Sequence, residues 1–116
     1  MTVQELAGLL DARILNPDVP TDMQVQCGYT CDLLSWVMTH GAGGTAWITV
    51  MTHMNAVAVA TLLEFSCVIV PEGIAVGDPV LKKATEEGLA ILSSSQSAYE
   101  LSGKLFAAGI LPAERK

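Results

Sequence analysis

The segment AWITVMTHMNAVAVA, residues 46–60, places one histidine and one asparagine among apolar residues. A continuous apolar run gives way there to apolar residues at helical spacing, which predicts that a strand ends and a helix begins. Thr52, His53 and Asn55 occupy that junction. An imidazole and a carboxamide can each hydrogen-bond to an anion, and the imidazole can also carry a proton. The junction is therefore the first candidate site.

Other polar side chains follow the neighbouring apolar runs. Thr30 and Asp32 come after the run near residue 25, and two serines come after the run near residue 89. In parallel α/β sheets, ligands bind at the carboxyl ends of the strands, where helix N-termini offer N–H groups. The sequence therefore predicts one cleft for a small anion, a phosphate or an acyl phosphate, formed by Thr30, Asp32, Thr52, His53, Asn55, Ser94 and Ser95.

Helix capping is the alternative explanation of these polar residues. Serine, threonine and asparagine are the residue types that helix N-termini need, so Thr52, Asn55 and the serines would act as caps. His53 would then point into solvent.

Other site chemistries find little support in the sequence. Cys27, Cys31 and Cys67 lack the paired spacing of a metal site, and their odd number fits a reducing compartment without disulfides. The glycines of GAGG, residues 41–44, precede a predicted strand, so they are expected to end a helix rather than hold a phosphate. No G-x-S-x-G motif is present, and nothing fixes a geometry between Asp32 and His53. We expect no catalytic residue, no metal and no cofactor.

The elements that position these residues form a regular series. Apolar runs predict strands at residues 25–29, 46–50, 67–70 and 90–92, and each run is followed by a helical pattern. Runs that are continuously apolar are typical of strands covered on both faces, and links of helix length favour parallel pairing. The sequence thus predicts a small single α/β domain, residues 1–116, with a mostly parallel sheet of four to five strands flanked by helices.

Helix ends are marked by local signals. Thr2 with Glu5, and Ser97 with Glu100, predict capping boxes, the first of them for a helix that begins the domain. Asp78 followed by proline predicts an N-cap, and glycines 88 and 109 stand where helices should stop.

Composition limits the class of protein and its partners. Charged residues make up 16% and hydrophobic residues 51% of the chain, which predicts that a second subunit covers part of the surface, as in a homodimer. Trp36 and Trp47 are expected to be core or interface anchors. The formal net charge of −6, without a basic stripe, argues against nucleic acid. No membrane-length apolar run or signal peptide is found, so we expect a cytoplasmic protein without membrane contact.

Several segments together resemble a known family. CDLLSWVM, AWITVMTHMNAVAVA, CVIVPEG, AILSSSQSAYE and LFAAGI make the chain similar to the small stand-alone proteins of the DRTGG-domain family, over residues 3–110. This domain also stands at the N-terminal side of HPr kinase/phosphorylase, within some phosphotransacetylases and between CBS domains in some pyrophosphatases. The chain contains no Asp-Arg-Thr-Gly-Gly run, and TVMTHMNAVAVA, with His53 and Asn55, stands in its approximate place.

The resemblance implies an α/β domain like the N-terminal domain of HPr kinase, often dimeric, that regulates rather than catalyses. It also implies an association with anaerobic redox systems such as iron hydrogenases. We therefore expect a non-catalytic regulatory or scaffold module that acts as a homodimer and senses a small anionic ligand. The alternatives are a structural subunit of a redox assembly, with a protein partner there, and a minor enzyme that uses His53.

Overall fold

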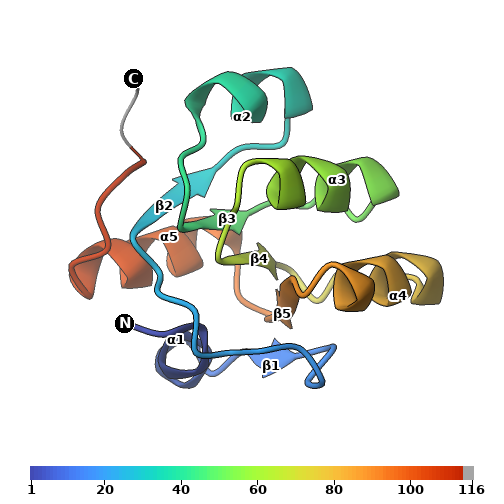
Figure 1. Ribbon diagram of the computed structural model, residues 1–116. Coiled ribbons are helices and arrows are strands. Elements are labelled where there is room, and N and C mark those ends of the chain that lie inside the picture. The colour runs from blue at the N-terminus through green and yellow to red at the C-terminus, as the bar shows by residue number, and fades with distance from the viewer. Residues whose placement is uncertain (114–116) are drawn as a thin grey trace.

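The computed structural model describes residues 1–113. Within this range, helices and strands alternate along most of the chain (Figure 1). The helices are α1 (Val3–Leu10), α2 (Leu34–His40), α3 (Met54–Leu62), α4 (Asp78–Glu86) and α5 (Ala98–Ala107). The strands are β1 (Arg13–Ile14), β2 (Cys27–Thr30), β3 (Thr45–Ile48), β4 (Cys67–Val70) and β5 (Ala90–Ser93).

The strands form one sheet in the order β1-β5-β4-β3-β2. Strands β2 to β5 are parallel, and Ile48 of β3 lies opposite Thr30 on one side and Ile69 on the other. A helix follows each of these strands, and α2, α3 and α4 return the chain to the start of the next strand, as crossover connections require. The predicted α/β class and mostly parallel sheet are therefore confirmed, with four predicted strands close to the observed ones.

One strand was not predicted from the sequence. β1 is only two residues long and pairs antiparallel with β5, Arg13 opposite Ser93 and Ile14 opposite Leu92. The buried Asn16 extends this edge, because its side-chain Nδ2 donates to the carbonyl of Leu89 at 2.8 Å and its Oδ1 accepts from the N–H of Ile91 at 2.9 Å. Two residues are too few to show a periodicity, so only the tertiary pairing defines this strand.

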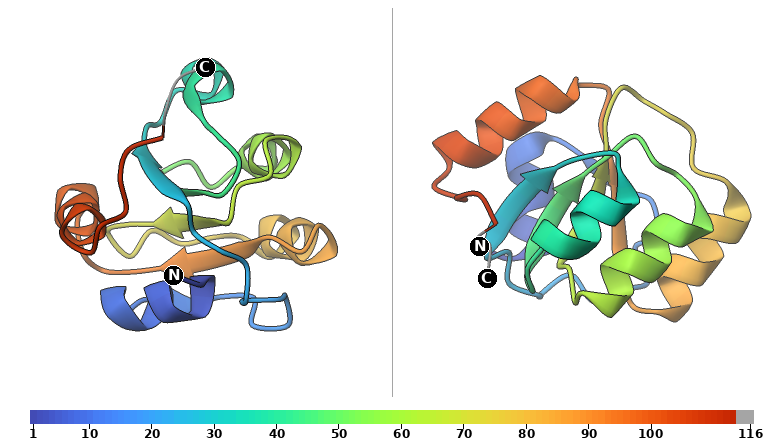
Figure 2. Two further views of the ribbon diagram at one scale, coloured as in Figure 1. Left: turned by 60° about the vertical axis from the view of Figure 1, so that its left-hand side comes forward. Right: turned by 90° about the horizontal axis from the view of Figure 1, so that it is seen from above.

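Helices cover both faces of the sheet. Figure 2 shows α2, α3 and α4 on one face and α1 and α5 on the other. All residues of β3 and β4 are buried, as the continuous apolar runs predict. On the α2–α4 side, Trp47 is completely buried and its ring meets that of Phe65 edge-on, with centroids 5.7 Å apart. The prediction of a core role is thus confirmed for Trp47, whereas Trp36 is 48% exposed.

Most helix ends agree with the sequence signals. Both capping boxes are present, and Gly88 and Gly109 have the positive φ angles, 72° and 87°, of helix stops. The N-cap of α4 is Gly77, however, so the assignment of Asp78 as the cap is wrong. Asp78 is the first helical residue, where its carboxylate still complements the helix dipole. Within residues 1–113 no helix is long and apolar enough to cross a membrane.

Candidate functional site

Asp32 connects the C-terminal ends of two neighbouring strands, β2 and β3, at the β2 edge of the sheet. Its carboxylate oxygen Oδ1 accepts hydrogen bonds from the Thr49 hydroxyl at 2.8 Å and from the N–H of Val50 at 2.9 Å. The Thr49 hydroxyl in turn accepts from the N–H of Met51 at 3.2 Å. Asp32 therefore acts as a clamp between the segments that follow β2 and β3, a role that sequence analysis did not assign to it.

Thr30 lies toward the α5 side of the sheet. Its hydroxyl is 2.7 Å from the hydroxyl of Ser102 on α5. Both residues line a cleft of about 200 Å³ between β2 and α5, whose other walls include Phe106 and Ile110. Most of this lining is apolar, so the cleft offers an anion little besides two hydroxyl groups that already bond to one another.

The residues of the junction after β3 lie toward the opposite helical layer. His53 is the N-cap residue of α3, but no side-chain hydrogen bond caps this helix. The expected capping by Thr52 or Asn55 is therefore wrong, and His53 and Asn55 are exposed. Thr52 and His53 line a cavity of about 10 Å³ with apolar residues of α3 and α4, a space of about one water molecule.

The two serines after β5 differ in environment. Ser94 is buried, its hydroxyl accepts from the N–H of Gln96 at 3.0 Å, and its carbonyl accepts from the N–H of Gly73 at 2.8 Å. Ser95 is exposed. Ser94 thus shapes the turn into α5 and ties it to the segment after β4.

The seven predicted residues share the carboxyl edge of the sheet, but Thr30 and His53 line different cavities. The described residues also show no hydrogen bond between Asp32 and His53 that would pair a base with its orienting group. In residues 1–113, no three His, Cys, Asp or Glu side chains are close enough together to hold a metal ion. Binding of a ligand at this edge stays a prediction.

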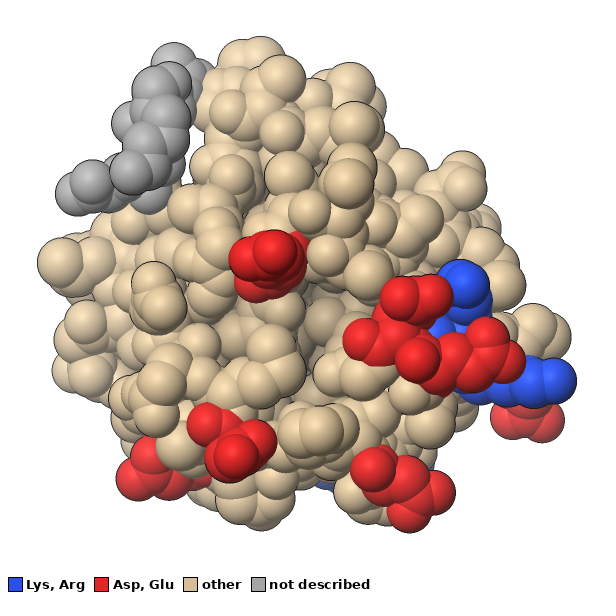
Figure 3. All heavy atoms as spheres, in the orientation of Figure 1, with Lys and Arg blue, Asp and Glu red and all other residues tan. Residues whose placement is uncertain are grey.

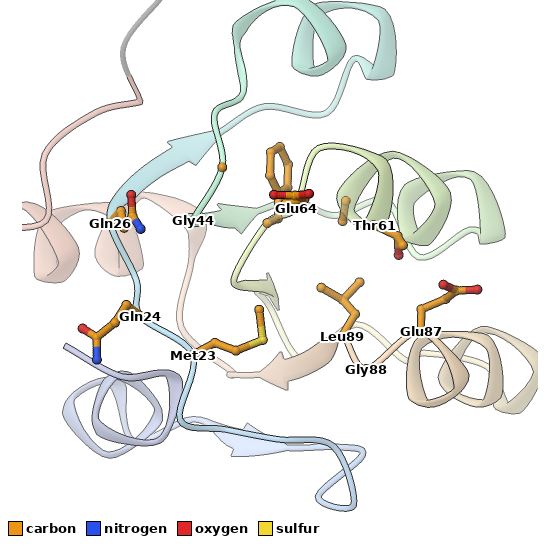
Figure 4. Close-up of a pocket in the computed structure, with 12 residues that line it drawn as sticks. Met23, Gln24, Gln26, Gly44, Thr61, Glu64, Glu87, Gly88 and Leu89 are labelled. Carbon is orange, nitrogen blue, oxygen red and sulfur yellow. The ribbon is translucent and has the colours of Figure 1, made fainter.

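A larger cavity than these two lies at the opposite edge, where the parallel strands begin. It has a volume of about 590 Å³, within the range of small-molecule sites. Four segments that lead into β2, β3, β4 and β5 surround it, and Figure 4 shows their side chains around one opening. Its walls are formed by Met23, Gln24, Gln26, Gly43, Gly44, Ala60, Thr61, Glu64, Phe65, Glu87, Gly88 and Leu89. We call this space the amino-edge cavity.

The amino-edge cavity has an apolar base and a polar rim. Ala60, Phe65 and Leu89 are buried, whereas the glutamines and glutamates are exposed. Its charged walls are Glu64 and Glu87, and none of its residues is Lys, Arg or His. The C-terminal ends of α3 and α4, which carry partial negative charge, also lie here. Lys83, which does not line the cavity, forms an ion pair with Glu87 at 3.0 Å. Because the charged side chains of the walls themselves are both acidic, the cavity favours a neutral or cationic ligand over an anion.

Thr61, in the wall of the amino-edge cavity, has an unsatisfied polar atom. Its hydroxyl oxygen is buried and has no hydrogen-bond partner among the described residues. Buried polar atoms are nearly always hydrogen-bonded, so this hydroxyl is an exception that should lower the stability of the free protein.

Gly44 holds the wall of the amino-edge cavity together. Its N–H donates to the Glu64 carbonyl and its carbonyl accepts from the N–H of Gln26, both at 2.9 Å. Its φ of 81° and the approach of Gln26, whose Cγ would lie 2.8 Å from an added Cβ, require glycine. Gly41 ends α2, so the prediction that GAGG stops a helix is confirmed.

The three cysteines differ in burial. Cys27 and Cys67 are buried and Cys31 is half-buried, and all three are free thiols. Burial raises the pKa of the Cys67 thiol to about 12, so it stays protonated at neutral pH.

Among solved structures, the chain is similar to the CBS and DRTGG domains of the regulatory region of Clostridium perfringens pyrophosphatase, in complex with the activator diadenosine tetraphosphate. The TM-score is 0.68 at 11% identity, and the match covers 97% of this chain and 50% of that one. The chain thus spans half the length of that structure. At this identity the likeness shows the fold alone. No protein-family profile matches the chain, and no curated protein is significantly similar to it.

Proposed function

We propose that the chain is a non-catalytic regulatory module of the DRTGG type, which acts as a homodimer and responds to a small ligand in the amino-edge cavity. The observation that carries this proposal is the cavity of about 590 Å³, in which four chain segments meet around an apolar base and a polar rim. The fold that the chain shares with a pyrophosphatase regulatory region supports a regulatory role.

The ligand of this chain should differ in charge from that of the pyrophosphatase region. Diadenosine tetraphosphate carries several negative charges, and binding it would require cationic side chains to offset them. The amino-edge cavity has Glu64 and Glu87 and no cationic residue in its walls. A neutral or cationic compound with hydrogen-bonding groups and an apolar part fits these walls better, since its polar groups can reach the exposed rim glutamines.

A cavity-blocking variant with a matched control tests the ligand proposal. Gly43 lines the cavity, and an added Cβ there would meet nothing nearer than the Leu63 carbonyl at 4.0 Å, so Gly43→Phe fills space without a clash at Cβ. Gly103→Phe on α5 adds the same side chain at an exposed position outside the cavity. Both variants and the parent are screened by thermal shift against amino acids, polyamines, nucleosides and phosphorylated metabolites.

The proposal predicts that a neutral or cationic compound stabilises the parent and Gly103→Phe but not Gly43→Phe. At 100 times its dissociation constant such a compound adds about 2.7 kcal/mol to the free energy of unfolding. If no compound stabilises the parent, or if every stabilising compound acts equally on Gly43→Phe, the cavity is not the ligand site.

The anion predicted at the carboxyl edge is a second candidate. His53 and Asn55 are exposed at the N-terminus of α3, where free N–H groups favour negative charge, but Asp32 follows the neighbouring strand at the same edge and opposes it. A phosphate or acyl phosphate that stabilises the parent and not the variant with both His53→Ala and Asn55→Ala would support this site instead. Equal stabilisation of parent and double variant would exclude it.

Two other functions rest on the sequence resemblance. A structural subunit of a redox assembly, for example one with a hydrogenase, would use the same fold with a protein partner and no ligand. A minor enzyme would use His53, which lies exposed and without a hydrogen-bonded carboxylate among the described residues. Co-purification of a redox protein with the tagged full chain would favour the first, and turnover abolished by His53→Ala would favour the second.

A further inference from the structure

A long internal part of the chain has no charged side chain. From Leu33 to Leu63 the sequence contains no Asp, Glu, Lys or Arg. This part includes β3, which is buried, but also α2 and α3, which lie on the outside of the sheet (Figure 2). In Figure 3 the surface over α2 and α3 is free of charged groups, which lie at its lower border and beyond. Helices that face water normally carry charges on their outer side.

Helix α3 carries apolar residues on its outer side as well as on its inner side, with Asn55 as the exposed polar residue of the outer side. Val57 and Ala60 are buried in the core between helix and sheet. The exposed side carries Met54, Ala58 and Leu62 at intervals of four residues, and Leu62 is 68% exposed. A helix that is apolar on both sides is normally covered by protein on both. The outer stripe lacks such a covering element among the described residues.

Helix α2 continues this apolar surface. It packs beside α3, and its exposed apolar residues are Trp36, Met38 and the N-cap residue Leu33. The ring of Trp36 stacks on that of His40 with centroids 4.1 Å apart. Tryptophan and methionine are enriched in protein interfaces. Trp36 and Met38 lie on opposite flanks of the buried Val37, so the exposed apolar residues of α2 surround its outer side. We define the α2–α3 face as Leu33, Trp36, Met38, Met54, Ala58 and Leu62.

We propose that the α2–α3 face is the surface at which two copies of this chain associate, with the α3 stripes packed across a two-fold axis. The inference rests on the homodimer of the proposed function and assigns its interface. Residues four apart on a helix form a ridge, and two such ridges interdigitate in the commonest class of helix packing. A two-fold interface brings the same surface of both copies together, so one stripe meets its own copy.

The middle of the α3 stripe is shaped for such a contact. Ala58 has the smallest side chain of the three, and it lies between the long side chains of Met54 and Leu62. The distance between two packed helices depends on the side chains at their point of contact, so alanine there lets the two α3 helices approach closely. The longer side chains on either side of Ala58 can then pack around the crossing point.

Charge explains why a second copy fits this face. Each copy has a formal net charge of −6, so most surfaces would bring carboxylates together when two copies meet. Helices α1, α4 and α5 all carry acidic residues in their first turns. The α2–α3 face carries no Asp, Glu, Lys or Arg, so two identical chains meet there without repulsion and bury apolar side chains.

Sedimentation velocity of the full chain at micromolar concentrations tests the interface. Ala58→Glu places two carboxylates opposite one another at the centre of the proposed contact and should raise the dimer dissociation constant by about 100-fold or more. Ala107→Glu is the matched control, because it makes the same change at an exposed position of α5, outside the face. The proposal expects dimers for the parent and Ala107→Glu and monomers for Ala58→Glu, with unchanged circular dichroism.

The outcomes separate the interface from the proposed function. A monomeric parent would contradict the homodimer itself. A dimeric parent with a dimeric Ala58→Glu would contradict only the α2–α3 face. Should Ala58→Glu fail to fold, dilution of the parent provides a test without substitution, since Trp47 is buried and Trp36 is 48% exposed in the single chain. Tryptophan emission should then shift to longer wavelength as the dimer dissociates, and no shift across the dissociation would overturn the proposal.

Discussion

Thr61 and Leu62 are consecutive residues of α3 that belong to two different surfaces. The Thr61 hydroxyl is buried beside the amino-edge cavity, whereas Leu62 is 68% exposed on the α2–α3 face. Successive side chains on a helix point about 100° apart, so one turn of α3 contributes to both surfaces. A ligand in the cavity and a second copy of the chain would therefore contact the same turn, which gives a regulatory module a direct link between binding and assembly.

Replacing the unsatisfied hydroxyl should stabilise the free protein. Thr61→Val keeps the shape of the side chain and removes a buried polar atom without a partner, so the free energy of unfolding should rise by about 1 kcal/mol in urea denaturation. Thr85→Val on α4 is the control, because its hydroxyl donates to the Leu81 carbonyl at 2.8 Å. A loss of about 1 kcal/mol or more for Thr61→Val, beyond the control, would show that the hydroxyl already has a partner.

We expect the hydrogen bonds of Asp32 to stabilise the fold. Asp32→Ala removes the acceptor for the Thr49 hydroxyl and the Val50 N–H and should lower the free energy of unfolding by about 1–2 kcal/mol. Asp32→Asn keeps an oxygen acceptor at Oδ1 and should lose less. Asp18→Ala, in an exposed loop, is the control. If Asp32→Ala is as stable as the parent in chemical denaturation, the residue is free for another role, such as ligand binding.

Stability should decrease at high pH because of Cys67. Burial raises the pKa of this thiol from 9.0 to about 12, so the unfolded chain releases the proton first as the pH rises. The contribution of Cys67 to the free energy of unfolding is complete below pH 9 and is lost as the pH rises toward 12. The free energy of unfolding should decrease in that range by up to about 1.4 kcal/mol per pH unit. Denaturant unfolding of the parent and Cys67→Ala between pH 8 and about 10.5 measures the slope. Parallel pH profiles of the two proteins would contradict the prediction.

Disrupting the capping box of α5 should change both the free energy of unfolding and the pKa of Glu100. Ser97→Ala should cost about 1 kcal/mol of unfolding free energy. Hydrogen bonds from the backbone N–H and the side chain of Ser97 hold the pKa of Glu100 below its ordinary value. The variant keeps the N–H, so the Glu100 pKa should rise only part of the way in an NMR titration. Glu5, in the box with Thr2, is the internal control and should not change.

Much of the fold was predictable because its signals are local. The apolar runs of β3 and β4 and the capping boxes at Thr2 and Ser97 are each contained in a few consecutive residues. β1 was not predictable, since its two residues are defined only by pairing with Leu92 and Ser93. The start of α4 was misplaced by one residue because proline is tolerated throughout the first helical turn.

The candidate site was less predictable because side-chain direction is a tertiary property. The sequence places Thr30 and His53 at the same edge of the sheet but cannot tell that they line different cavities. The amino-edge cavity was not predicted at all. Its walls consist largely of glycines, apolar residues and helix ends, and only the convergence of four distant segments creates it. The hydrogen bond from the Gly44 N–H to the main-chain carbonyl of Glu64 joins two of these segments and carries no recognisable sequence motif.

An NMR titration of the full chain with the compound that most stabilises it in the thermal-shift screen tests the central claim most directly. The account predicts that amide signals change in a cluster at Gln26, Gly44, Thr61, Glu64 and Gly88, around the amino-edge cavity. The amides that follow β2 and β5, at the opposite edge of the sheet, should stay unchanged. Changes confined to the carboxyl edge, or spread without a cluster over the surface, would contradict a regulatory ligand site in the amino-edge cavity.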